Sequence, residues 1–161
     1  MPDYQVDFRN ARELRIGEGD EVVAAFHRGR FIQDMKGEIR GQPSTMRLPA
    51  PWRGMRYRLV RGGRELASAA TPDFKRAPES SGHIVSFALE MPGRKLDLVA
   101  QDRHGLLYLL SEGGTEIGRL EQREFGEQDT WSADFRTREE SPGLAAFIAW
   151  LAREVRSKLG T

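Results

Sequence analysis

The 161-residue chain contains no cysteine, which excludes disulfide bonds and thiolate metal or redox sites. Histidine is also scarce, and the three that occur, His27, His83 and His104, do not have the spacing of a metal site. Charge of one sign is lacking as well, because 25 basic residues accompany 24 acidic ones and the net charge is +1. A protein this evenly charged has no global attraction to nucleic acid, and we expect no nucleic-acid partner.

Long apolar runs are absent too. The unbroken run from Leu144 to Ala152 has nine residues, whereas a helix that spans a bilayer needs about 20. The first ten residues, MPDYQVDFRN, lack the basic-then-apolar pattern of a secretory signal, and no lipidation motif is evident. We therefore expect a cytoplasmic protein with no transmembrane segment.

The sequence has none of the common catalytic motifs. A nucleophile elbow, a phosphate-binding loop and a dinucleotide fingerprint are all missing. Asp102 and His104 lie close enough in sequence for an acid–base pair, but the sequence Asp-Arg-His-Gly is more typical of a turn. We expect a protein that is not an enzyme, with no catalytic residue, no metal and no cofactor.

What the sequence does contain is a series of short alternating segments between glycine and proline turns, which predicts strands. Residues 41–51 hold three prolines and are predicted to be a loop around at most one edge strand, and residues 72–82 a long polar connection. The predicted strands are residues 4–8, 13–16, 21–27, 30–35, 55–60, 66–70, 83–90, 94–100, 106–110, 115–120 and 130–135.

One hairpin pattern occurs more than once. YRLVRGGRELASAATPDF, from Tyr57, matches YLLSEGGTEIGRLEQREF, from Tyr108, without a gap at an offset of 51 residues. A weaker third copy, from Leu14, is offset by 43 residues. Each copy has apolar residues at alternate positions, a two-residue turn and an apolar return strand. Repetition of such a hairpin predicts a barrel.

The last segment, SPGLAAFIAWLAREVRSKLG, predicts a helix over about 142–159, with Ser141 as N-cap, Pro142 in the first position and Gly160 at the end. One stripe of the helix is apolar throughout, and the opposite face is apolar only in the first turns. The stripe comprises Leu144, Phe147, Ile148, Leu151, Val155 and Leu159, and the opposite face Ala145, Ala146, Ala149 and Trp150, then Arg153 and Arg156.

A helix that is apolar all round is enclosed, whereas a surface helix has a polar back. We therefore predict one mainly β domain over 1–161. In it, a closed antiparallel β-barrel of about 10–12 strands, residues 4–136, encloses the C-terminal hydrophobic helix and releases it near Arg153.

The one local excess of charge lies between Ile39 and Arg64, where seven arginines occur without an acid. Arg56 and Arg58 are two residues apart on a predicted strand and share the face opposite Tyr57. One interpretation is an ion-paired surface, with partners from the acidic segment 121–140. The other is an anion-binding patch of Arg53, Arg56 and Arg58 for lipid headgroups or another phosphate-bearing ligand.

YRLVRGGRELASA, YLLSEGGTEIGRL and the AAFIAWLA helix together resemble the tubby C-terminal-like superfamily, which includes tubby proteins, phospholipid scramblases and LURP-one-related proteins. The resemblance implies a closed barrel around a hydrophobic C-terminal helix. No acidic cluster resembles a scramblase calcium site, and the tubby phosphoinositide contacts do not map onto this chain, so no binding residue follows from it.

These observations predict a non-catalytic binding module for an anionic ligand or lipid headgroup on the outer barrel surface. Two alternatives stay open. One is a lipocalin-like barrel that holds a small apolar molecule in its lumen, with the helix packed outside. The other is a protein–protein interaction domain. The oligomeric state is left open.

Overall fold

Thirteen antiparallel strands and one helix make up the described part of the chain, which covers residues 3–9, 12–29, 34–50, 55–76, 83–102, 105–124, 128–135 and 142–158 of a computed structural model. The elements are β1 (Asp3–Arg9), β2 (Glu13–Glu18), β3 (Glu21–Arg28), β4 (Met35–Ile39), β5 (Gln42–Arg47), β6 (Tyr57–Arg61), β7 (Arg64–Ala69), β8 (Asp73–Arg76), β9 (His83–Met91), β10 (Arg94–Ala100), β11 (Leu107–Glu112), β12 (Thr115–Glu124), β13 (Gln128–Phe135) and α1 (Pro142–Lys158).

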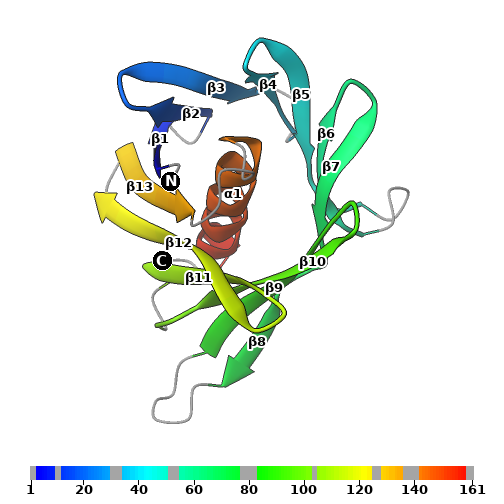
Figure 1. The fold of residues 1–161 in the computed structure, drawn as a ribbon, viewed down its shortest axis with the longest axis vertical. Helices are drawn as coiled ribbons and strands as arrows, with labels where there is room; N and C mark the ends of the chain where they lie inside the picture. Colours follow the sequence, from blue (N-terminus) through cyan, green and yellow to red (C-terminus); the bar gives the residue numbers. More distant parts are fainter. Residues whose placement is uncertain are drawn as a thin grey trace.

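Twelve of the strands form a closed ring, as predicted (Figure 1). Strands β1 to β7 pair in chain order, as do β9 to β13, and β13 pairs with β1. The ring closes between β7 and β9, where two residue pairs are formed, Ser68 with Glu90 and Ala69 with Leu89. Strand β8 continues along the same edge of β9 beyond this joint.

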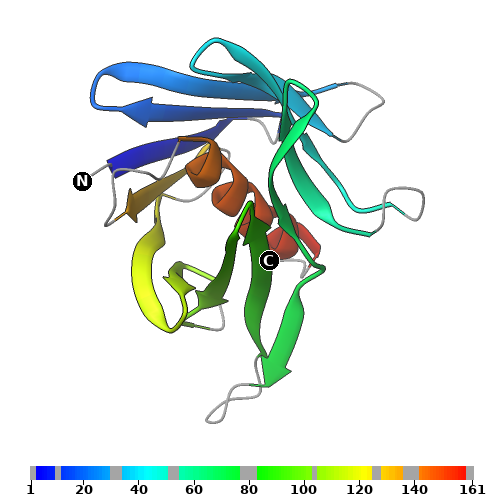
Figure 2. The same cartoon turned by 45° about the vertical axis from the view of Figure 1, so that its right-hand side comes forward.

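Helix α1 runs through the middle of the ring, as Figures 1 and 2 show from two directions. Every residue from Leu144 to Ala152 is at most 2% exposed. Ala146 and Ala149, on the face that a surface helix would turn to solvent, are both 0% exposed. The predicted enclosure of the helix is confirmed, and the alternative in which the helix packs outside the barrel is wrong. The described part contains no helix that is both long and apolar enough to cross a membrane.

The strands turn alternate side chains toward the helix. On β13, the alternate residues Trp131, Ala133 and Phe135 are buried. Tyr57 from β6 packs edge-on against Trp150 of the helix, with ring centroids 5.6 Å apart. The core therefore consists of one shell of inward side chains and the helix that it surrounds.

Arg153 and Glu154, near the predicted exit of the helix, are half-buried, and Val155 after them is buried. The Arg153 guanidinium lies 4.4 Å from the centroid of the Phe8 ring. Glu154 accepts a hydrogen bond from Arg28 of β3 at 2.9 Å. These contacts attach the second half of the helix to the strands at the mouth of the barrel. Ser141 and Gly160, the predicted helix ends, lie outside the described residues.

Three segments differ from the prediction. Strand β4 begins at Met35, where the predicted strand 30–35 ends, and residues 30–33 are outside the described part. The predicted loop 41–51 contains β5, which is no edge strand because it pairs with both β4 and β6. Pro43 fits there because pairing with β6 starts one residue later, at Ser44. The predicted connection 72–82 contains β8.

Three hairpins of the ring have the same local geometry. In β2–β3, β6–β7 and β11–β12 the register shifts directly after Ile16, Leu59 and Leu110, which are positions that the sequence comparison aligned. Each shift is a β-bulge, which bends a strand and helps a sheet to close. The two glycines of the second hairpin have φ of 58° and 76°, and those of the third 58° and 84°. The residues skipped by the pairing are Val23, Leu66 and Ile117.

Candidate anion-binding surface

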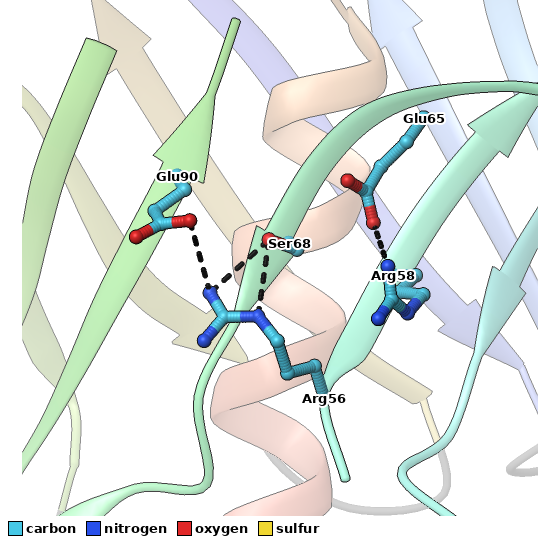
Figure 3. Close-up of polar contacts among 5 residues, drawn as sticks. All are labelled: Arg56, Arg58, Glu65, Ser68 and Glu90. Carbon is cyan, nitrogen blue, oxygen red and sulfur yellow. Dashed lines mark hydrogen bonds and ion pairs between the residues drawn. The ribbon is translucent and has the colours of Figure 1, made fainter. Parts of the chain in front are cut away.

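Arg56 precedes β6 and reaches across β7 toward β9 on the outer surface (Figure 3). Its Nε and Nη2 donate hydrogen bonds to Ser68 Oγ at 3.3 and 3.1 Å. Nη2 also lies 3.8 Å from Glu90 Oε2. Ser68 and Glu90 are directly opposite one another across the joint between β7 and β9. Arg56 thus connects the two strands at which the ring closes.

Arg58, two residues further on, forms an ion pair with Glu65 of β7. Its side chain is 31% exposed and that of Glu65 43% exposed. Glu90 and Glu65 thus pair with Arg56 and Arg58 in the part of the chain that the structure describes, and neither belongs to the acidic segment 121–140. Arg53, the third residue of the predicted patch, lies outside the described residues.

Arg47 is a member of this surface that the sequence analysis did not single out. It lies on β5 directly opposite Arg58, so two guanidinium-bearing side chains are neighbours on the outer face. Arg61 and Arg64 likewise face each other where β6 turns into β7. Like charges directly opposite in a sheet are destabilising. Arg47 was missed because 41–51 was predicted to be a loop, which has no strand register.

A small hollow of about 170 Å³ adjoins these arginines. Its lining includes Glu65, Ser68 and Glu90, with Leu66 and Met91 as apolar neighbours. Because its charged groups are carboxylates, the hollow itself repels an anion. An anion would instead contact the exposed arginine side chains of β5 and β6, which makes the site an open surface.

The other candidate residues do not assemble into a catalytic or metal site in the described part of the chain. No group of three or more His, Asp or Glu side chains there could hold a metal ion. His27 is exposed on β3, His83 starts β9, and His104 is outside the described residues. Asp102 Oδ1 accepts the Leu106 N–H at 3.1 Å, which is the turn geometry expected of an aspartate.

Elsewhere on the outer wall, two carboxyl groups have shifted pKa values. Arg94 donates two hydrogen bonds to Glu112, at 2.9 and 3.1 Å, and this contact lowers the pKa of Glu112. Burial raises the pKa of Asp134, and Asp3, directly opposite on β1, raises it further. Both groups lie away from the arginine surface.

Comparison of the chain with models of known protein families, with curated proteins and with solved structures finds no match.

Proposed function

We propose that this protein is a non-catalytic binding module that holds an anionic ligand, such as a lipid headgroup or another phosphate-bearing group, on the outer surface of β5 and β6. The ligand contacts Arg56 and Arg58, with Arg47 beside them. The proposal rests mainly on the direct opposition of Arg47 and Arg58 across two paired strands.

The energetic argument concerns the balance of charge around this pair. Two opposed arginines destabilise a sheet by a few tenths of a kcal/mol up to about 1 kcal/mol. Glu65 is engaged by Arg58, and Glu90 lies next to Arg56. A phosphate placed over Arg47 and Arg58 reduces their repulsion and accepts hydrogen bonds from two planar guanidinium groups.

The filled interior also supports binding on the outside. Helix α1 occupies the space in which a lipocalin-like barrel holds its ligand, and its residues from Leu144 to Ala152 are at most 2% exposed. A cytoplasmic location belongs to the proposal as well, and the absence of cysteine supports it.

A tubby-like relationship and an origin of the ring by hairpin repetition also belong to the proposal. Both are supported by the enclosed helix and by the bulges that recur after Ile16, Leu59 and Leu110.

Co-sedimentation with vesicles tests this function, using vesicles of neutral lipid with and without an anionic phospholipid. Each basic side chain near an anionic surface contributes about 1 kcal/mol. Arg47→Ala with Arg58→Ala should therefore weaken binding by about 2 kcal/mol, or roughly 30-fold. Binding should also fall as the salt concentration rises.

The matched control is Arg119→Ala with Arg123→Ala, which removes two arginines from β12 that pair with Glu116 and Glu121. The control should bind as the unchanged protein does. Competition with inorganic phosphate separates a general phosphate site from one that needs a lipid surface. Failure of the unchanged protein to bind either probe refutes the proposal, as does equal binding by the Arg47/Arg58 variant.

A further inference from the structure

A second and larger hollow lies in the outer wall across β2, β3 and β4, away from the arginine surface. Its volume is about 420 Å³, which falls within the range of about 300–1,000 Å³ typical of small-molecule sites. Its lining is formed mainly by Glu13, Arg15, Ala25, His27 and Glu38.

Two small residues, Ala25 and Gly37, belong to the lining of the hollow. Ala25 projects from β3 into its middle with only a methyl group. Gly37, on β4, lies so close to β3 that an added Cβ would be 1.8 Å from the Ala25 carbonyl oxygen. Only glycine allows the two backbones to approach in this way.

The register of the strands places charges of both signs around Ala25. Arg15 on β2 and Glu38 on β4 are each directly opposite Ala25, on either side of it. Two strand spacings, or about 9.6 Å, separate their backbones. Glu13 is directly opposite His27 in the next outward-facing row. The charged side chains that line the hollow are therefore Arg15 and two glutamates, and Lys36 on β4 lies directly opposite His27 outside the lining.

Among the described residues, some charged side chains of the wall form ion pairs and others do not. Arg58, Arg94 and Arg119 all form ion pairs with neighbouring glutamates. Within the described residues, Arg15 and Glu38 form none, although both are exposed and long enough to meet over Ala25. Their charged ends are available to a ligand that enters the hollow.

We propose that this hollow binds a small zwitterion, a molecule that carries both a carboxylate and an ammonium group, such as a free amino acid or a dipeptide. Arg15 holds the carboxylate through its planar guanidinium. Glu38, with Glu13 nearby, holds the ammonium group. A simple anion can pair only with Arg15 and a simple cation only with the glutamates, so a ligand with both charges makes the most contacts. This site is independent of the proposed anion-binding surface.

Amide NMR shifts of the full chain, titrated with glycylglycine, test the proposal. N-acetylglycine lacks the ammonium group and glycinamide lacks the carboxylate, so they serve as the two matched probes. We expect saturable shifts on β2, β3 and β4 with glycylglycine, and binding at least about tenfold weaker for either matched probe, because each loses a charged hydrogen-bond partner.

Two variants remove the site in different ways. Arg15→Met removes the cation, and Ala25→Phe fills the hollow without changing any charge. Both should abolish the shifts, whereas Lys95→Met on β10 should leave them unchanged. No saturable shift at about 10 mM glycylglycine overturns the proposal, and so does a matched probe that binds as tightly as glycylglycine. The Arg47/Arg58 variant should bind glycylglycine normally, so the two proposals fail separately.

Discussion

Replacement of Ala146 by arginine is the sharpest test of the enclosed helix. Ala146 is 0% exposed, and so are its neighbours Ala145 and Ala149. An arginine there has no route to solvent through the surrounding strands. The effective penalty for burying an unpaired ion is several kcal/mol, and the extra volume adds about 1–3 kcal/mol. This total is comparable with the whole stability of a typical domain, about 5–15 kcal/mol.

We therefore expect Ala146→Arg to give no soluble folded protein. Ala146→Met carries the added volume without the charge, and it should fold with stability reduced by about 1–3 kcal/mol. The matched control is Ala88→Arg, the same substitution at an exposed position of β9. It should leave stability within about 0.5 kcal/mol of the unchanged protein.

The assay is the soluble fraction on expression, followed by urea unfolding of each soluble variant. Fluorescence of Trp131 and Trp150, both 1% exposed in the folded protein, reports the unfolding. If Ala146→Arg is soluble and unfolds at the same urea concentration as Ala88→Arg, then the helix is not enclosed and the reasoning fails.

Two further substitutions probe the wall. Burial and the neighbouring Asp3 disfavour the ionised form of Asp134 and raise its pKa in the folded state. The folded protein therefore loses stability as the pH rises through the ordinary aspartate range. Asp134→Asn should therefore raise the unfolding free energy at pH 7 by a few tenths of a kcal/mol. At a pH well below the ordinary aspartate range it should have no effect. Urea unfolding of both proteins at both pH values measures the difference. Gly37→Ala should lower the melting temperature by about 2–12 °C, because its Cβ would overlap the Ala25 carbonyl. An unchanged melting temperature in calorimetry contradicts the close approach.

The fold could be predicted from the sequence where a local pattern is compatible with only one structure. Gly62-Gly63 and Gly113-Gly114 each mark a two-residue hairpin turn, since both positions need positive φ, and both hairpins are found. The helix was placed correctly because Ala145, Ala149 and Trp150 occupy the face that a surface helix fills with polar residues.

The prediction failed for segments whose conformation depends on pairing with a neighbouring strand rather than on their own composition. Prolines made 41–51 resemble a loop, yet β5 is held between β4 and β6 and its Pro43 precedes the first pair with β6. Strand β8 is four residues long and depends on β9 for its conformation. Such short segments are strands only because a partner is present, and single-sequence patterns do not report a partner.

The candidate sites show the same limit. The arginine-rich stretch was visible in the sequence, but its ion-pair partners Glu65 and Glu90 depend on the register of β7 and β9. The pairing of Arg47 with Arg58 depends on β5, which was missed. The hollow around Ala25 needs three strands in register and a close approach at Gly37, and no motif in the chain marks it.

The position of α1 after all thirteen strands has a consequence for biosynthesis. A ribosome makes the chain from its N-terminus, so the whole wall is translated before the segment that fills it. Until residues 142–158 emerge, the inward side chains of the strands have nothing to pack against. The nascent strands therefore carry exposed apolar faces, which are the surfaces that chaperones bind. The core can therefore be completed only after its last element, α1, has been translated.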